Sequence, residues 1–162
     1  MTDLESAVAA LTRRVQALED ELAIHRVIVR YGLAVDTGDA ERTAAVFAPE
    51  GVYDADVRLM NGRADIEDMV RGVRHQRMVG RCAHQIGPAV VRVDGDTAVA
   101  LGYSRVYLRT EPPEHRIDVY RVSLNRWELE RRGGSWLIVR RVTRLLGHEE
   151  AKTIFADGLA DV

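Results

Sequence analysis

Apolar residues recur at alternating spacings of four and three along the start of the chain. The residues between them are largely charged, so the apolar side chains form one stripe along a helix. A stripe with this heptad spacing buries little on a single helix and is typical of a helix that pairs with another. The residues of the stripe are Leu4, Val8, Leu11, Val15, Leu18 and Leu22.

The same helix is predicted to run to about residue 35, but its apolar spacing changes after Leu22. The later apolar positions have the spacing of a helix packed on its own domain. We interpret residues 1–22 as an arm for self-association; the alternative is one amphipathic helix lying on its own domain. We expect a homo-oligomer, a trimer in preference to a dimer. The later apolar positions are Ile24, Val27, Ile28, Tyr31 and Val35.

Turn residues divide the rest of the chain into short helices followed by long strands. Gly38 suits a left-handed helix end, and Asp39 suits the N-cap of a helix over 40–47. A strand over 52–59, a turn at Asn61-Gly62 and a helix over 64–75 are predicted next. Four strands follow, over 81–93, 97–108, 115–131 and 135–146. The order predicts an α+β domain over 23–147, and 148–162 form a short helix or a tail.

Composition excludes several classes of protein. The chain has 162 residues, of which 46% are hydrophobic and 30% charged, as expected for one globular domain. A net charge of −2 gives no general attraction to nucleic acid or anionic membranes. The apolar runs are too short to span a bilayer, no export signal is visible, and the single Cys82 cannot form an internal disulfide. We therefore expect a cytoplasmic protein.

Asp36 is the first candidate for chemistry, because a carboxylate is poorly placed there. It lies near the apolar stripe of the first helix, one turn after Gly32, at the helix end where the macrodipole disfavours an anion. A carboxylate in that position needs a partner or takes up a proton readily. The alternative is that Asp36 is a turn residue of the Asp-Thr-Gly-Asp sequence.

His84 is the second candidate, because it alone of five histidines lies within an apolar strand. A lone strand histidine is more often structural than catalytic. A buried His paired with a buried Asp, however, is a tuned general base, because the carboxylate fixes the tautomer and stabilises the imidazolium. Metal-ligand spacing and a glycine-rich phosphate loop are both lacking, so we expect no metal and no cofactor.

Polar residues also alternate along the strand over 115–131. Ser123, Asn125 and Trp127 share one face, where they can donate into a cavity or satisfy neighbouring backbone. The preceding strand presents small side chains, which leave room for a ligand: Ala98, Ala100, Gly102, Ser104 and Val106. Arginines on these strands are interpreted as a solvated or intersubunit face: Arg121, Arg126, Arg131, Arg132, Arg140, Arg141 and Arg144.

Two segments resemble the opening of the nuclear transport factor 2-like superfamily: Tyr31-Gly-Leu-Ala-Val-Asp36-Thr-Gly-Asp39 and Ala45-Val-Phe-Ala-Pro-Glu-Gly-Val-Tyr53. The chain is most similar to the SnoaL-like branch, whose enzymes include scytalone dehydratase and hexachlorocyclohexane dehydrochlorinase. The resemblance covers about residues 24–147. It implies a cone-shaped α+β barrel, with a strongly curved, mainly antiparallel sheet wrapped by three helices around a deep pocket for a small hydrophobic molecule.

The resemblance also implies roles for individual residues. Asp36 and His84 match a catalytic dyad that abstracts a proton beside a carbonyl while a hydroxide or another group leaves. Ser123 and Asn125 match residues that orient the substrate. Ser104 departs from the pattern, because it stands where scytalone dehydratase has a second pocket histidine.

A second departure concerns the water-holding tyrosine of scytalone dehydratase, which Val35 replaces. Tyr31 or Tyr53 is expected to supply a phenol instead. The expected substrate-binding set is Tyr31, Tyr53, Ser104, Ser123, Asn125 and Trp127.

These roles predict a cofactor-independent lyase or dehydratase, or a polyketide-cyclase-like enzyme, acting on a small hydrophobic cyclic substrate. One alternative is a ketosteroid-isomerase-like isomerase, with Tyr31 and Asn125 as oxyanion donors and Asp54 or Asp56 as the base. Another is a non-catalytic small-molecule-binding protein of the same fold. A buried Asp–His pair in the pocket would favour the enzyme, since a binder has no need for it.

Overall fold

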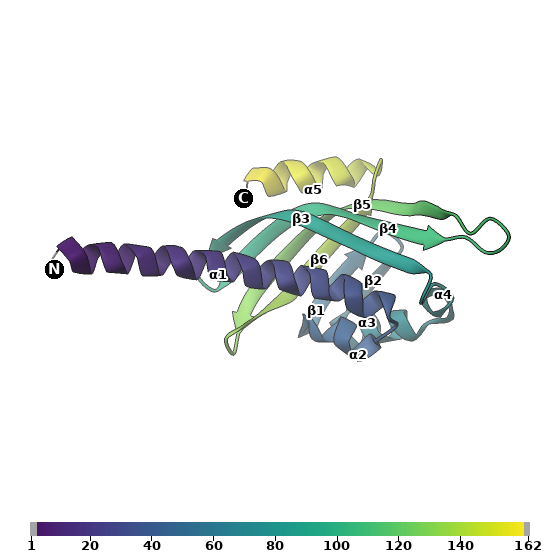
Figure 1. The fold of residues 1–162 in the computed structure, drawn as a ribbon, viewed down its shortest axis with the longest axis horizontal. Coiled ribbons are helices and arrows are strands. Elements are labelled where there is room, and N and C mark those ends of the chain that lie inside the picture. The colour runs from purple at the N-terminus through teal and green to yellow at the C-terminus, as the bar shows by residue number, and fades with distance from the viewer. Residues whose placement is uncertain (1–2, 161–162) are drawn as a thin grey trace.

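The computed structural model describes residues 3–160 (Figure 1). Its helices are α1 (Asp3–Asp36), α2 (Ala40–Ala45), α3 (Gly62–Arg71), α4 (Val73–Gln76) and α5 (Glu149–Ala160). Its strands are β1 (Phe47–Ala55), β2 (Arg58–Asn61), β3 (Cys82–Asp94), β4 (Thr97–Arg109), β5 (Ile117–Arg132) and β6 (Ser135–Leu145). The α+β class is confirmed. Residues 1–2 of the predicted arm and 161–162 of the predicted C-terminal segment lie outside the described residues.

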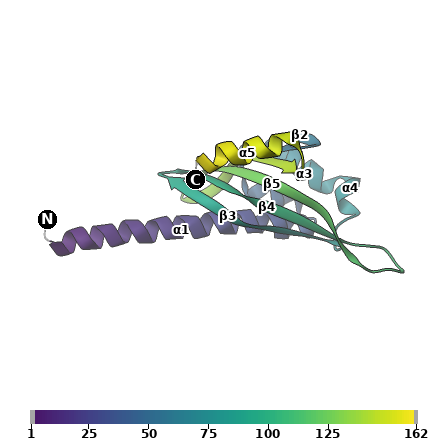
Figure 2. The ribbon, with the colours of Figure 1, turned by 90° about the horizontal axis from the view of Figure 1, so that it is seen from above.

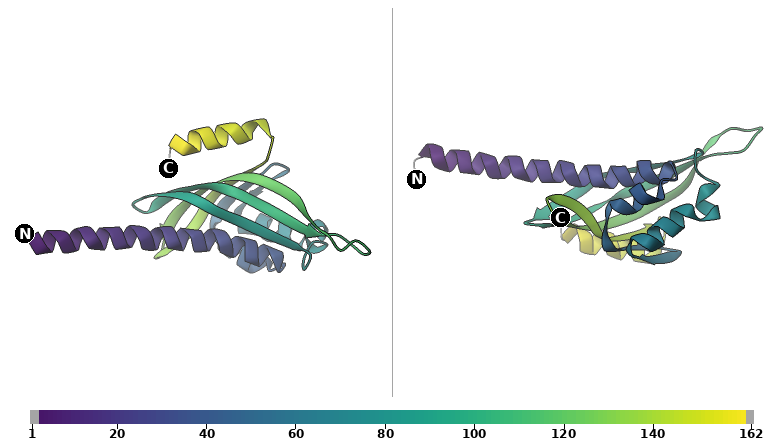
Figure 3. Two further views of the ribbon diagram at one scale, coloured as in Figure 1. Left: turned by 45° about the horizontal axis from the view of Figure 1, so that its top comes forward. Right: turned by 90° about the horizontal axis from the view of Figure 1, so that it is seen from below.

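The six strands form one curved sheet that does not close into a barrel (Figure 3). Their order is β2-β1-β6-β5-β4-β3, and all neighbouring pairs are antiparallel except β1 with β6. Strands β3 to β6 correspond to the four predicted strands and form an antiparallel meander, with Gly95 and Gly133 at positive φ in its tight turns. The expected curved, mainly antiparallel sheet is therefore present, and it is open at β2 and β3.

The segment between α2 and α4 differs from the prediction. Strand β1 begins at Phe47 rather than at residue 52, because Phe47 is buried in the core and pairs with Ile138 of β6. The turn falls at residues 56–57, so Gly62 begins α3 instead of ending a hairpin. Gly72 lies between α3 and α4, where a single helix over 64–75 was predicted.

The second half of α1 packs on the concave face of the sheet along β3. Ile24, Ile28 and Val35 are buried there in the core with Trp127. Gly32 sets how closely the helix approaches, because a Cβ at this position would lie 2.9 Å from the backbone oxygen of His84. Asp36, one helical turn later, is thereby brought to His84.

The helix is held at a second point, near the turn between β5 and β6. The buried Asp20 accepts hydrogen bonds from Arg131 Nη2 at 2.7 Å and from Trp136 Nε1 at 3.2 Å. The N-terminal part of α1 extends past the end of the sheet (Figure 2). The domain therefore fixes the second half of α1 at both ends, and leaves the first half projecting.

Helix α5 covers the opposite face of the sheet from α1 (Figure 3). It packs on Leu101, which points away from its core-facing neighbour Ala100, and the ring of Phe155 lies 5.3 Å from that of Tyr103. The C-terminal segment thus forms a helix. Among the described helices, none combines the length and apolar character needed to cross a membrane.

Candidate functional site

Asp36 and His84 are 48 positions apart in sequence and directly bonded in the structure. The Nδ1 atom of His84 lies 2.5 Å from Asp36 Oδ1, and the backbone N–H of His84 donates to Oδ2 at 2.7 Å. Both side chains are mostly buried, with 19% of Asp36 and 16% of His84 exposed. The carboxylate of Asp36 therefore binds both the ring and the backbone of His84, and these two contacts fix the plane of the ring.

The charge of Asp36 decides which ring nitrogen is free. Burial alone would raise the pKa of Asp36, but the hydrogen bonds from the ring and backbone of His84 outweigh it and hold the pKa below its usual value. Asp36 is thus ionised at neutral pH and accepts the Nδ1 proton of His84. Nε2 is then left as the basic atom of the ring.

Cys82 is a third group at this carboxylate. Its Sγ lies 3.4 Å from Asp36 Oδ1, and burial together with the neighbouring negative charge raises the pKa of the thiol to about 11. The three ligand atoms lie within 4.8 Å of one another, near enough to share a cation. However, the thiol remains protonated and Asp36 already accepts three hydrogen bonds, so the cluster has the character of a hydrogen-bonded dyad.

A cavity of about 460 Å³ opens beside the dyad. His84 lines it from β3, Tyr31 and Val35 from α1, and Tyr53 from β1. A volume of this order holds a small molecule. The remaining lining is largely apolar, with a few charged groups: Ala55, Val57, Arg58, Met60, Asp68, Met69, Gly72, Val73, Arg74, His75, Met78, Val106, Tyr120 and Arg121.

A buried arginine lies against the two cavity tyrosines. The guanidinium carbon of Arg141 is 4.3 Å from the ring centroid of Tyr31 and 4.6 Å from that of Tyr53. Only 2% of Arg141 is exposed, and its Nη1 has no hydrogen-bond partner among the described residues. The interpretation of Arg141 as part of a solvated face is therefore wrong. Its charge lies in the core, on aromatic rings that line the cavity.

The protonation of Tyr31 follows from the same surroundings. Burial, and then the neighbouring Tyr53, raise the pKa of Tyr31 far more than the positive charge of Arg141 lowers it. Tyr31 is therefore a neutral phenol across the working range of pH. A neutral phenol next to a fixed positive charge is a strong hydrogen-bond donor toward an oxygen that becomes negative.

The polar residues predicted on β4 and β5 are brought together, in a layer beside this arginine. Asn125 Nδ2 donates to Ser104 Oγ at 2.9 Å, and Asn125 Oδ1 accepts from Arg141 Nε and Nη2 and from Thr143 Oγ1, at 3.1, 2.8 and 2.8 Å. Ser123 accepts from Arg121 Nε at 2.8 Å.

Of the six predicted substrate-binding residues, Tyr31 and Tyr53 line the cavity. The other four are buried, and among the described residues they do not belong to its lining: Ser104, Ser123, Asn125 and Trp127. Two of these four residues hold the guanidinium of Arg141 in place. Asn125 Oδ1 accepts a hydrogen bond from it, and the ring centroid of Trp127 lies 5.6 Å from its carbon.

Close packing explains why several residues of β4 are small. Gly102 faces the backbone of β3, and a Cβ there would lie 2.9 Å from the oxygen of Pro88. Ala98 and Ala100 pack in the core, whereas Val106 lines the cavity. The space predicted along this face is thus partly filled by the neighbouring strand and by the core.

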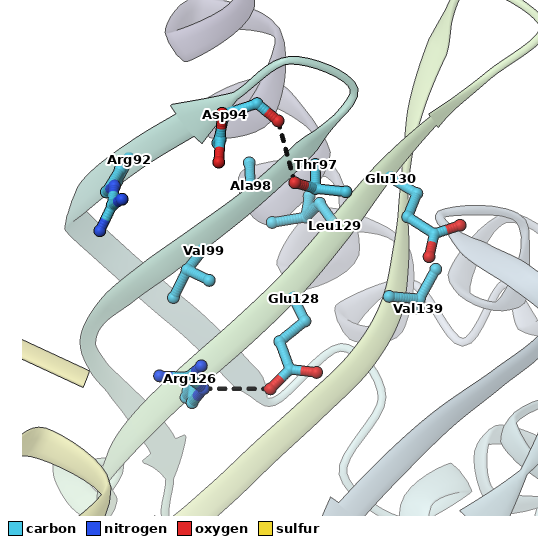
Figure 4. A pocket seen from close by; sticks show the side chains of 10 residues that line it. All are labelled: Arg92, Asp94, Thr97, Ala98, Val99, Arg126, Glu128, Leu129, Glu130 and Val139. Atoms are coloured by element: carbon cyan, nitrogen blue, oxygen red, sulfur yellow. Dashed lines mark hydrogen bonds and ion pairs between the residues drawn. The ribbon is translucent and has the colours of Figure 1, made fainter. Parts of the chain in front are cut away.

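A second hollow, of about 390 Å³, lies on β3, β4 and β5 (Figure 4). Its rim carries charges of both signs, and Arg126 Nε donates to Glu128 Oε1 at 3.1 Å. The dyad does not belong to its lining, which within the described part of the chain is Arg92, Asp94, Thr97, Ala98, Val99, Arg126, Glu128, Leu129, Glu130 and Val139. The cavity beside His84 is therefore the better candidate.

Comparison with solved structures agrees with this fold. An NTF2-like protein with a cystatin-like fold from Novosphingobium aromaticivorans is 36% identical, with a TM-score of 0.83 over 89% of this chain and 94% of the other. A candidate scytalone dehydratase from the same organism is 18% identical, with a TM-score of 0.68 over 80% and 85%. A hexachlorocyclohexane dehydrochlorinase from Novosphingobium barchaimii is 16% identical, with a TM-score of 0.69 over 82% and 90%.

The last two likenesses are of fold alone. No curated protein matches the sequence. The SnoaL-like domain family matches residues 16–142, which include both members of the dyad and Arg141. This chain therefore belongs to the SnoaL-like domain family, within the NTF2-like fold.

Proposed function

We propose that the chain is a cofactor-independent lyase of the dehydratase type, which removes a proton beside the carbonyl of a small hydrophobic cyclic molecule. A polyketide-cyclase-like reaction begins with the same proton removal and is included in the proposal. One observation carries it: His84 lines a cavity while its Nδ1 is bound at 2.5 Å by an ionised carboxylate. This is the arrangement that makes an imidazole a directed base.

The reaction starts when Nε2 of His84 takes the proton from the carbon next to the carbonyl. The C–H electron pair moves into the new carbon–carbon double bond, and the carbonyl oxygen becomes an enolate oxygen. Asp36, held ionised, stabilises the imidazolium that results. The enolate then expels the hydroxyl group on the next carbon, the proton on Nε2 passes to that leaving oxygen, and water departs with the dyad restored.

The tyrosines and Arg141 supply the other half of the chemistry. The phenol of Tyr31 or Tyr53 donates to the carbonyl, and the Arg141 charge behind both rings favours the enolate. A donor aimed at a developing negative charge commonly contributes about 10²–10³-fold to turnover. A mostly apolar cavity strengthens such contacts, because little water competes.

The isomerase alternative has weaker support. Its base would be Asp54 or Asp56, yet Asp54 pairs with Arg144 at 3.0 Å and Asp56 pairs with Arg121. Within the described residues, neither aspartate belongs to the lining of the cavity, whereas His84 does. The named dehydratase and dehydrochlorinase among the fold neighbours favour an elimination instead.

Binding followed by turnover tests the proposal and separates it from a non-catalytic binder. Hydroxy-ketones, lactones and steroids are screened for a rise in melting temperature, and the ligands found are incubated with the protein and their products identified. We expect loss of water from a bound hydroxy-ketone. His84→Gln should retain binding and lose about 10²–10⁴-fold in turnover, while His115→Gln, an exposed control, should match the wild type. Binding without turnover by the wild type would favour the binder.

A further inference from the structure

An exposed apolar stripe runs along α1 from its projecting end to Leu22, and we call this stripe the seam. It consists of Leu4, Val8, Leu11, Val15, Leu18 and Leu22. Each of these side chains is between 53% and 74% exposed, whereas the later apolar residues Ile24 and Ile28 are buried against the sheet. The N-terminal part of α1 runs beyond the sheet, so no strand lies beside it there (Figure 2).

The seam lies on the side of α1 that faces away from the sheet. At 100° per residue, its mean direction is about 140° from that of the sheet-facing residues Ile24, Ile28 and Val35. Val29 and Leu33 continue the seam side over the body of the domain and are 45% and 65% exposed. A partner helix can therefore lie along α1 without displacing any strand.

We propose that the seam binds the same seam of a second copy of this chain, as a parallel two-stranded coiled coil. In heptad terms, Val8, Val15 and Leu22 occupy the a positions, and the d positions are all leucine. β-branched residues at a with leucine at d favour two strands over three. The heptad positions thus point to a dimer, in place of the trimer expected from the sequence.

The charges beside the seam select the parallel orientation. In a parallel pair, a g residue faces the partner's e residue five positions later, so Arg14 meets the partner's Glu19, and Glu21 meets the partner's Arg26. Both pairs attract, and symmetry doubles each of them. In an antiparallel pair with the seams fully overlapped, Arg14 meets the partner's Arg14, and Glu5 meets the partner's Glu19, so like charges face each other.

Solution mass and a charge reversal test the proposal on the full chain. Sedimentation equilibrium should give a dimer. Arg14→Glu turns two attractive contacts into repulsive ones and should raise the dimer dissociation constant about tenfold. Adding Glu19→Arg to it should restore the wild-type value. The matched control is Arg13→Glu, the same change at an f position away from the seam, which should have little effect.

Each contrary result has a definite meaning. A monomeric or trimeric mass would overturn the two-stranded pairing. Equal dissociation constants for Arg14→Glu and Arg13→Glu would overturn the parallel orientation. Both arginines are exposed, so thermal unfolding of the domain should be the same for both variants and shows that neither has lost its fold. None of these outcomes depends on the proposed reaction.

Discussion

Gly32→Ala is the smallest change that should separate Asp36 from His84. Gly32 lies in the interior of α1, and the added Cβ would meet the backbone oxygen of His84 at 2.9 Å and its Cβ at 3.5 Å. The first obstacle is backbone of a paired strand and cannot rotate aside. The helix must therefore move away from β3, and it carries Asp36 with it.

Two opposing effects set the change in stability. In an exposed helix, replacing Gly by Ala stabilises by about 0.5–1 kcal/mol. Overpacking a close contact costs about 1–3 kcal/mol. We therefore expect Gly32→Ala to lower the free energy of unfolding by roughly 1 kcal/mol, or roughly 2–4 °C in melting temperature for a chain of this size.

The effect on the dyad should be larger than the effect on stability. A hydrogen bond of 2.5 Å lengthens with any outward movement of α1. A displacement of about 1 Å can cost about 10²-fold in rate, so a shift of a few tenths of an ångström should cost about tenfold. The Nδ1 proton of His84 reports the change without any substrate, because its NMR resonance moves upfield as the bond to Asp36 weakens.

Gly158→Ala is the matched control, because its Cβ would meet only the flexible end of the Leu101 side chain, at 2.7 Å, on the other face of the sheet. It should leave the resonance of His84 unchanged. If Gly32→Ala raised the melting temperature and kept the wild-type resonance, the idea that Gly32 sets the distance between Asp36 and His84 would be refuted.

Buried charges give three further predictions. The rate of alkylation of Cys82 should titrate with a midpoint near pH 11. Asp36→Asn should lower that midpoint, because the neighbouring negative charge is gone, and an unchanged midpoint would contradict the contact between Cys82 and Asp36. The hydrogen bond from Arg131 holds the pKa of Asp20 below its unfolded value, so its stabilisation is present above about pH 4 and is lost as pH falls through the folded pKa. Chemical unfolding measured from about pH 5 down to about pH 2 should therefore be less pH-dependent in Asp20→Asn than in the wild type. Arg141→Met removes a buried charge that is hydrogen-bonded to the neutral side chain of Asn125, so the free energy of unfolding should change by less than about 2 kcal/mol while turnover falls about 10²-fold. A large loss of stability with normal turnover would make the arginine structural.

Much of the fold could be predicted, because its breaks are chemically marked. Glycine-containing turns at 94–96 and 132–134 mark the ends of the meander strands, and Asp39 caps α2 by accepting the N–H of Arg42 at 2.9 Å. Asp36 and His84 could be found because each is an anomaly in its own element. Strand β1 was misplaced because Pro49 and Gly51 look like a break, while the burial of Phe47 extends the strand through them.

The burial of Arg141 could not be predicted from the sequence, because a bulge changes which side chains of β6 face the core. Simple alternation from Trp136 and Ile138 points Arg140 inward. The pairing of β5 with β6 shifts by one residue between Glu128 and Leu129, so Arg141 faces the core instead. A single inserted residue moves every later side chain to the other face, and such a shift has no reliable signal in one sequence.

Proton exchange tests the central claim most directly, because it asks only whether His84 removes a proton next to a carbonyl. A ketone that raises the melting temperature of the protein is incubated with it in D2O, and incorporation of deuterium at the neighbouring carbon is followed by NMR. The wild type should accelerate the exchange, and His84→Gln should exchange at least about 10²-fold more slowly, with binding retained. Equal exchange by the two proteins, with the ketone bound to both, would contradict the Asp36–His84 dyad as the catalytic base.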